Sequence, residues 1–270
     1  AEEVATMDNT AIAAAAALLA EHRIERRPLA ELPADCRPRT EDETYAIQDA
    51  MNRLLASRDI GVIAGYKIGC TTPVMQQYMG IDHPGAGAIL APTVHDSPAD
   101  LAFAGYVAIG VEGEIAIRLA ADLPPAGAPY DRDAIFAAIE CCCTAIELVD
   151  ARYVDYRSLD TWTMVADNFF NAGCILGTPV ADWRGIDMTA VPGRMTVNGR
   201  VAGEGRGANV MGHPFDAAVW LANTMARRGL GLKAGEWVMT GSIVETQWLE
   251  QGDAVAFEID ALGGVTARFA

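Results

Sequence analysis

Short apolar runs, each ended by glycine or proline, fill the chain from residue 62 onward, and they constrain its fold more than any other feature. Such runs predict β-strands rather than helices. The strands do not alternate regularly with helices, so a doubly wound parallel fold is not expected and the pattern predicts an α+β architecture. The predicted strands are VIAGYKIGC, YVAIGVEGEIAIRLA, CTAIELVDARYV, GCILG, RMTVNG, EWVMTGS, AVAFEI and VTARFA.

Helical patterns are concentrated in the N-terminal part of the chain. They predict one helix over 8–22 and another over 41–57, the second opened by a capping box of Thr40 and Glu43. The segment between them contains three prolines and is predicted to be irregular.

Two further helices are predicted within the strand-rich part, over 132–141 and 215–227. We therefore expect an N-terminal helical segment over 1–61 and a β-rich catalytic domain over 62–270, which can also form one continuous domain.

Composition excludes several classes of partner. The net charge of −16 argues against nucleic acid and anionic membrane surfaces. No apolar run is long enough to predict a transmembrane helix. The alanine-rich stretch AIAAAAALLA superficially suggests a signal peptide, but acidic rather than basic residues precede it, so a helix is expected. The six cysteines include the run 141–143 and form no CxxC pair, which is typical of reduced thiols in a cytoplasmic protein.

The stretch VEGEIAIRL places two carboxylates in an apolar strand. Glu112 and Glu114 are two positions apart, so their side chains are expected on the same face. Three interpretations stay open. The pair lies on a solvated edge with basic partners across the strand, or it binds a hard cation such as Mg²⁺, or it works as a general acid and base.

Two more charged residues occur in predicted apolar strands. Glu147 lies within AIELVD and would complete a three-carboxylate site if its strand neighbours that of Glu112 and Glu114. Lys67 lies within AGYKIGC, where a lysine is a surface cation, half of a structural ion pair, or a desolvated proton-transfer group.

Six motifs in register give the chain a resemblance to the 2-keto-4-pentenoate hydratase and 4-oxalocrotonate decarboxylase family of the fumarylacetoacetate hydrolase superfamily. These motifs are GYKIGCTTPVMQQYMGIDHPGAGAIL, VEGEIAIRL, AIELVDARY, ADNFFNAGCILG, GHPFDAAVWLAN and TGS. The resemblance implies a mixed β-roll core with an N-terminal helical region, and a bound Mg²⁺ or Mn²⁺. Carried onto this chain, it implies Glu112, Glu114 and Glu147 as metal ligands, Lys67 as the catalytic lysine, and Thr71, Thr72, Thr240, Gly241 and Ser242 as substrate-binding residues.

The implied activity is the hydration of a 2-hydroxy-2,4-dienoate to a 4-hydroxy-2-oxo acid in the catabolism of aromatic compounds. Three alternatives remain: a 4-oxalocrotonate-type decarboxylase, an acylpyruvate hydrolase or tautomerase, and a catalytically weakened binding partner. The family also implies a homo-oligomer that can associate with a related pathway enzyme.

The chain departs from the family pattern at GIDHPGAG. Gly85 stands where the family has an aspartate that pairs with the lysine, so Asp82, His83 or a water molecule would have to replace that carboxylate. A second departure, IVETQWLEQGD after the TGS turn, either reshapes the pocket rim or forms an ordinary strand.

Overall fold

One mixed sheet holds most of the strands and carries the candidate site. The computed structural model describes residues 7–58 and 60–270. The strand order is β2–β1–β10–β5–β6–β7–β3, and the short β11 pairs with β5. The pairs β1/β10 and β3/β7 are parallel and the other neighbours are antiparallel. The bounds are β1 Ile63–Gly69, β2 Gly85–Leu90, β3 Val94–Asp96, β5 Ile109–Leu119, β6 Ile139–Asp150, β7 Asn171–Leu176, β10 Trp237–Ser242 and β11 Gln247–Trp248.

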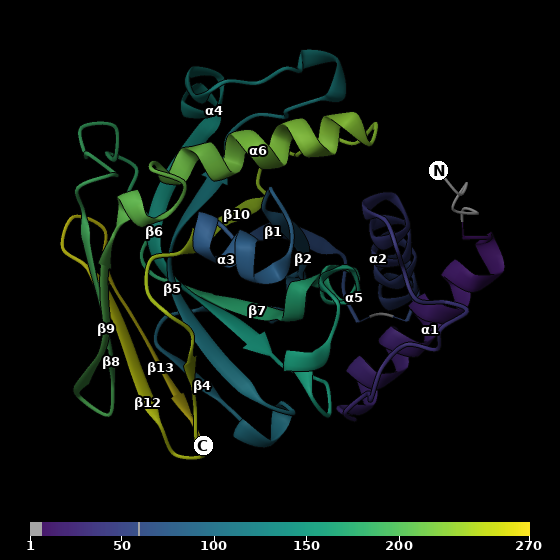
Figure 1. Ribbon diagram of the computed structural model, residues 1–270. Helices are drawn as coiled ribbons and strands as arrows, with labels where there is room; N and C mark the ends of the chain where they lie inside the picture. Colours follow the sequence, from purple (N-terminus) through teal and green to yellow (C-terminus); the bar gives the residue numbers. More distant parts are fainter. Residues whose placement is uncertain (1–6, 59) are drawn as a thin grey trace.

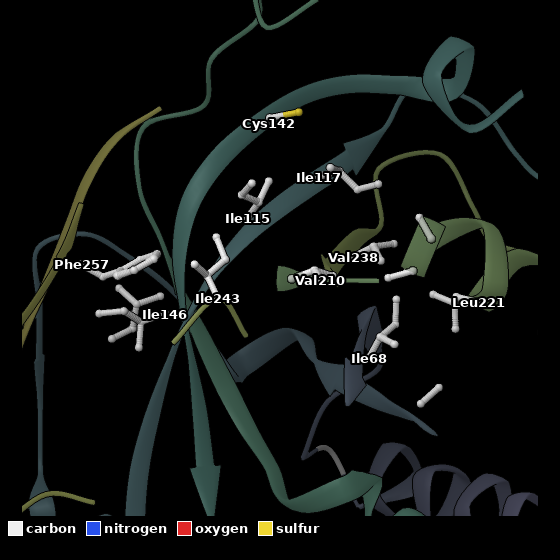
Figure 2. Packing of buried hydrophobic residues seen from close by; sticks show 14 of the residues in the cluster. Ile68, Ile115, Ile117, Cys142, Ile146, Val210, Leu221, Val238, Ile243 and Phe257 are labelled. Atoms are coloured by element: carbon white, nitrogen blue, oxygen red, sulfur yellow. The ribbon is translucent and has the colours of Figure 1, made fainter. Parts of the chain in front are cut away.

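A second sheet packs against the middle of the first and closes one side of the core. Its order is β4–β13–β12–β8–β9. Phe257 of β12 lies directly on Gly113 of β5, where an added Cβ would lie 2.5 Å from the ring. Figure 2 shows Phe257 beside Ile146 and Ile243 in the buried layer between the sheets. The bounds are β4 Ala99–Leu101, β8 Pro192–Val197, β9 Arg200–Arg206, β12 Ala254–Ile259 and β13 Gly263–Phe269.

The helices cover the remaining faces of the main sheet. α1 and α2 pack on each other at the opposite side of the molecule from β8, β9, β12 and β13, and α6 runs across β10 (Figure 1). The bounds are α1 Asn9–Glu25, α2 Glu41–Ser57, α3 Pro73–Met79, α4 Arg132–Ala138, α5 Thr161–Ala166 and α6 Pro214–Arg227. No helix in the described ranges is long and apolar enough to cross a membrane.

The α+β class with mixed sheets is confirmed, and so are the helices near the N-terminus. α2 spans the predicted 41–57. α1, predicted over 8–22, begins at Asn9 with Asp8 as its N-cap and runs three residues further than predicted, to Glu25. The helix predicted over 132–141 is wrong at its end, because α4 stops at Ala138 and β6 begins at the next residue.

Only half of the predicted capping box forms at α2. The Thr40 hydroxyl accepts a hydrogen bond from the amide of Glu43. The Glu43 carboxylate does not return to Thr40 and instead accepts the amides of Arg39 and Met7. Glu43 therefore fixes the chain that precedes the helix rather than the helix terminus alone.

The division at residue 61 stays a prediction, although the N-terminal helices make polar contacts with the strand-rich part. The Gln48 side chain donates to the backbone oxygens of Ala86 and Val165, at 2.8 and 2.6 Å. Asn52 exchanges hydrogen bonds with the side chain of Asn168. These contacts join α2 to β2 and to the segment that leads into β7.

Candidate metal centre and active-site cavity

The structure brings the three glutamates together on one face of the main sheet. In the β5–β6 pairing, Glu112 lies directly opposite Glu147. Glu114 follows two residues later on β5 and points to the same side. One carboxylate oxygen from each residue lies within 4.8 Å of the others, so the three could hold a metal ion.

Each of these carboxylates accepts a hydrogen bond that fixes its orientation. The donors are the Gly241 amide to Glu114 (2.8 Å), the Asn171 side-chain amide to Glu147 (3.0 Å) and the Thr246 hydroxyl to Glu112. After these bonds, Oε1 of Glu114 and Oε2 of Glu147 are buried and have no partner among the described residues. Buried polar atoms normally have a partner, and carboxylate oxygens are the ligands that Mg²⁺ and Mn²⁺ prefer. The donor set therefore fits a hard divalent cation.

Lys67 supplies one positive charge beside these carboxylates. It lies on β1, two strands away from β5, and its Nζ is 3.1 Å from Oε1 of Glu147. The side chain is buried, and Nζ also lies over the ring of Phe169, 4.7 Å from its centroid. Lys67 is therefore a desolvated cation held between a carboxylate and an aromatic face.

The electrostatics of the cluster show an excess of negative charge. Burial, together with the charges of Glu147 and Glu112, raises the pKa of Glu114 well above its usual value. Burial also raises the pKa of Glu147, because the opposing effect of Lys67 does not cancel it. Burial disfavours the charge on Lys67, but the nearby glutamates outweigh it and raise its pKa. A divalent cation would supply the positive charge that one lysine does not.

Glu147 is the carboxylate partner of Lys67, and neither Asp82 nor His83 substitutes for the side chain missing at Gly85. Asp82 is almost fully exposed, and the His83 ring bonds the oxygen of Pro84 and lies near the surface. An added Cβ at Gly85 would lie 3.0 Å from Val165 and 3.5 Å from the ring of Phe169. Val165 and Phe169 thus border the space that a side chain at position 85 would enter.

A cavity of about 1220 Å³ opens beside the cluster and contains several of the predicted site residues. Lys67 and Glu112 line it directly, together with Thr71, Thr72 and Ser242. Thr72 also caps α3 by accepting the amide of Met75, and the Ser242 hydroxyl donates to Val244.

The other two predicted substrate-binding residues, Thr240 and Gly241, are buried and do not belong to the cavity lining. Thr240 is fully buried, and its hydroxyl donates to the backbone oxygen of Ile115 at 2.8 Å. The amide of Gly241 is used by Glu114. Both residues therefore contact the strand that carries the glutamates.

Sequence reasoning missed three residues that hold this site. Asn171 orients Glu147, Thr246 orients Glu112, and Phe169 lies against Lys67. Asn171 and Phe169 belong to the ADNFFNAG motif, and Thr246 belongs to the departure after TGS, but no local pattern indicated their roles. In that departure, Glu245 and Trp248 line the cavity and Gln247–Trp248 forms the short strand β11, whereas a reshaped rim stays a prediction.

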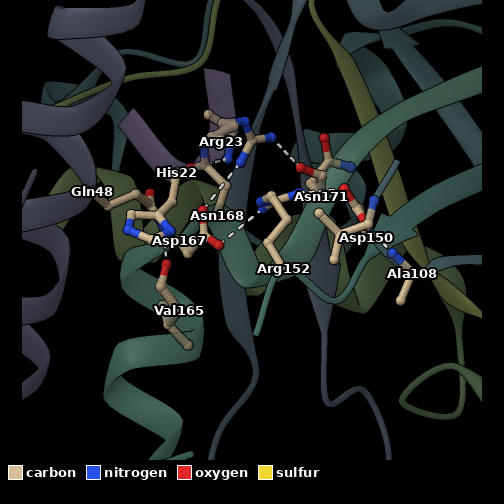
Figure 3. Close-up of polar contacts among 12 residues, drawn as sticks. His22, Arg23, Gln48, Ala108, Asp150, Arg152, Val165, Asp167, Asn168 and Asn171 are labelled. Atoms are coloured by element: carbon tan, nitrogen blue, oxygen red, sulfur yellow. Dashed lines mark hydrogen bonds and ion pairs between the residues drawn. The ribbon is translucent and has the colours of Figure 1, made fainter. Parts of the chain in front are cut away.

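A buried ion-pair network, shown in Figure 3, joins α1 to Asn171, the residue that donates to Glu147. Asp167 pairs with Arg23 of α1 at 3.2 Å and with Arg152 at 3.0 Å. Arg23 also donates to the backbone oxygen of Asn171, and Arg152 lies 3.7 Å from Asp150. The network therefore supports the residue that orients Glu147.

The remaining titratable candidates have structural roles. The His213 ring accepts the amide of Phe215 and caps α6. The six cysteines are free and buried. Burial raises the pKa of Cys143 to about 12, so its thiol stays protonated and is a poor nucleophile.

Comparison with known proteins identifies the family to which the chain is related. The fumarylacetoacetate (FAA) hydrolase C-terminal model matches residues 88–270. A 2-keto-4-pentenoate hydratase of Burkholderia vietnamiensis is 35% identical over 264 residues, covering 97% of this chain and 98% of that protein. A 2-hydroxyhexa-2,4-dienoate hydratase of Comamonas testosteroni is 32% identical over 245 residues, covering 90% and 91%.

Among solved structures, 4-oxalocrotonate decarboxylase from Pseudomonas putida G7, complexed with magnesium and adipate, superposes with a TM-score of 0.92 at 27% identity. The match covers 98% of this chain and 99% of that one. The family match, the full-length relatives and the shared fold agree with the expectation from the sequence motifs. The chain belongs to the fumarylacetoacetate hydrolase family.

Proposed function

We propose that this protein is a divalent-metal-dependent hydro-lyase that adds water to a 2-hydroxy-2,4-dienoate and forms a 4-hydroxy-2-oxo acid in aromatic catabolism. One observation carries the proposal. Three glutamates, two of them with a buried oxygen that has no partner among the described residues, lie beside a buried lysine at a cavity, in a chain 35% identical over nearly its whole length to a 2-keto-4-pentenoate hydratase.

Glu112, Glu114 and Glu147 would hold Mg²⁺ or Mn²⁺. When bound, the cation supplies a Lewis acid that stabilises negative charge on the 2-oxo acid head of the substrate. Thr71, Thr72 and Ser242 would contact the carboxylate of that head, since all three line the cavity beside Glu112. Thr240 and Gly241 would fix the floor on which the head rests.

Lys67 would transfer a proton to the substrate. It lines the cavity with its Nζ 3.1 Å from Oε1 of Glu147, so it lies beside a substrate head held at the glutamates. In the proposed reaction the 2-hydroxyl proton leaves and C5 gains a proton, which moves the double bond to C3–C4, in conjugation with the ketone. Water then adds at C4, and C3 gains the last proton.

Decarboxylation of a 4-oxalocrotonate-type acid is the second candidate. It is supported by the superposition on 4-oxalocrotonate decarboxylase along almost the whole chain. The same three glutamates would hold the divalent cation, which when bound supplies the Lewis acid for the negative charge left when carbon dioxide departs.

The test is turnover by the purified protein in Mg²⁺ or Mn²⁺. We expect loss of the ultraviolet absorbance of 2-hydroxypenta-2,4-dienoate and formation of 4-hydroxy-2-oxopentanoate, observed by NMR. Carbon dioxide release from 4-oxalocrotonate without hydration would select the decarboxylase. Cleavage or isomerisation of an acylpyruvate would select the hydrolase or tautomerase, and binding of a 2-oxo acid without turnover would indicate the weakened binding partner.

Assembly and location stay proposals. We expect a homo-oligomer that can associate with a related pathway enzyme. We also expect a cytoplasmic enzyme, which is supported by six buried free cysteines.

A further inference from the structure

The cavity beside Lys67 and Glu112 is much larger than a five-carbon acid needs. Its volume of about 1220 Å³ exceeds the roughly 300–1000 Å³ typical of pockets for drug-sized ligands. Of the proposed catalytic and metal-binding residues, only Lys67 and Glu112 belong to its lining. The rest of the wall is therefore shaped for a part of the ligand that the reaction itself does not use.

That remaining wall is rich in aromatic side chains and methionine. Tyr156 packs against Trp248 in a tilted arrangement with ring centroids 5.3 Å apart, and its ring lies edge to face with Phe170 at 6.2 Å. Trp162 and Met164 also line the cavity. Apolar and aromatic walls with few polar groups are typical of sites that bind the apolar part of a ligand.

Helix α3 leaves apolar side chains uncovered at this cavity. None of its residues is buried, and Val74, Met75 and Tyr78 are 75%, 44% and 71% exposed although they line the cavity. An exposed group of large apolar residues next to a polar site indicates a binding surface. Because α3 starts at the residue after Thr72, this surface adjoins the proposed position of the substrate carboxylate.

The charges of the lining disfavour a second carboxylate. Arg157 lines the cavity, with its guanidinium 4.9 Å from the Tyr156 ring centroid. Asp160 and Glu245 line the same cavity and outnumber it. A negatively charged tail would meet more negative than positive charge there.

We propose that the natural substrate carries a bulky apolar tail, an aromatic ring or a long alkyl chain, attached at C5 of the 2-hydroxy-2,4-dienoate. The tail lies against α3 and the Tyr156–Trp248 wall while the 2-oxo acid head lies at the glutamates. This inference rests on the proposed function and adds the class of substrate to it.

The experiment compares kcat/KM for 2-hydroxypenta-2,4-dienoate, its 5-ethyl and 5-phenyl derivatives, and 4-oxalocrotonate, all in Mg²⁺ or Mn²⁺. Each buried methylene is expected to raise kcat/KM about fourfold, through a lower KM, and the phenyl derivative to gain more than tenfold. Equal or better use of the unsubstituted acid, or preference for 4-oxalocrotonate, would overturn the apolar tail. If the protein consumes none of these dienoates, the proposed function itself fails.

Two variants test whether α3 binds the tail. Val74→Ser and Tyr78→Ser change exposed side chains, so the fold should tolerate them. Each is expected to lower the ratio of kcat/KM for the phenyl derivative to that for the unsubstituted acid at least threefold. The matched control is Val201→Ser, at a half-exposed valine of β9 outside the cavity lining, which should keep the ratio of the parent protein. An unchanged ratio in both α3 variants would refute this placement of the tail.

Discussion

Glu114 is the residue at which metal binding and folding can best be separated. Its carboxylate is fully buried, one oxygen accepts the Gly241 amide, and the other has no partner among the described residues. Glu114→Gln keeps an acceptor for Gly241 and removes the charge. Because folding raises the pKa of Glu114, each pH unit above the pKa of the unfolded chain costs the metal-free parent about 1.4 kcal/mol until the pKa of the folded state is reached, and the variant is spared this cost.

Bound metal should offset the stability that Glu114→Gln gains over the parent protein by losing this charge. At a cation concentration one hundred times Kd, the parent protein gains about 2.7 kcal/mol, since the ion binds only the folded state. For a chain of this size, that corresponds to a rise of about 5–11 °C in Tm. The variant should gain almost nothing, because a neutral amide is a weak ligand for Mg²⁺ or Mn²⁺.

In the absence of metal, the stability advantage of Glu114→Gln over the parent should grow as the pH rises. The raised pKa means that folded, metal-free protein keeps a proton on Glu114 that the unfolded chain releases above about pH 4.5. The free energy of unfolding of the parent therefore falls as pH rises from that value toward the pKa of the folded state. The variant lacks this proton and should lose less stability, so its advantage should vanish near pH 4.5 and grow at higher pH.

Thermal unfolding in chelator and in Mn²⁺, from about pH 5 to about pH 8, tests these expectations together. The control is Glu258→Gln, at an exposed glutamate of β12. A variant that keeps its metal-dependent rise in Tm would show that Glu114 is not a ligand. A variant less stable than the parent in chelator would show that the buried charge does not destabilise the metal-free fold.

Three further substitutions have clear expected outcomes. Lys67→Met should keep metal binding within about tenfold but lower kcat at least a hundredfold, as measured by substrate consumption, because it removes the proposed proton donor. Asn171→Ala should weaken Mn²⁺ binding about tenfold by calorimetry, because it frees Glu147 from its hydrogen bond, and unchanged affinity would contradict that role. Asp167→Ala should lower the free energy of unfolding, measured in urea, by about 3–5 kcal/mol, because it leaves two buried arginines without their shared partner. The control is Asp100→Ala, at an exposed site, which should change that free energy by no more than about 0.5 kcal/mol.

The alternation of side chains along a strand was enough to place Glu112 and Glu114 on one face. It could not show that Glu147 lies opposite Glu112, because register between strands depends on long-range pairing rather than on local pattern. The position of Lys67 was harder still, since β10, late in the chain, lies between β1 and β5. The family resemblance indicated that Glu147 and Lys67 lie near Glu112 and Glu114, and the structure shows the hydrogen bonds that orient each carboxylate.

Short or glycine-rich elements escaped prediction. α3 and α5 have seven and six residues, too few to show helical periodicity. β2 has the sequence GAGAIL, and glycine is depleted in strands. Its Gly87 is needed because an added Cβ would lie 2.1 Å from the backbone oxygen of Asn168, a close approach that only the folded chain reveals.

Asn168 belongs to a turn that limits how enzymes of this family can be combined into chimeras. Asn168, Phe169 and Phe170 all have positive φ, a conformation that is costly outside glycine. The Asn168 side chain bonds Asn52 of α2, 116 residues away, while the neighbouring Phe169 ring lies against Lys67. A chimera that exchanges the N-terminal helices with those of a relative would separate these partners unless the turn is exchanged with them. The N-terminal helices and this turn therefore form one unit that is discontinuous in the gene and has to be exchanged as a whole.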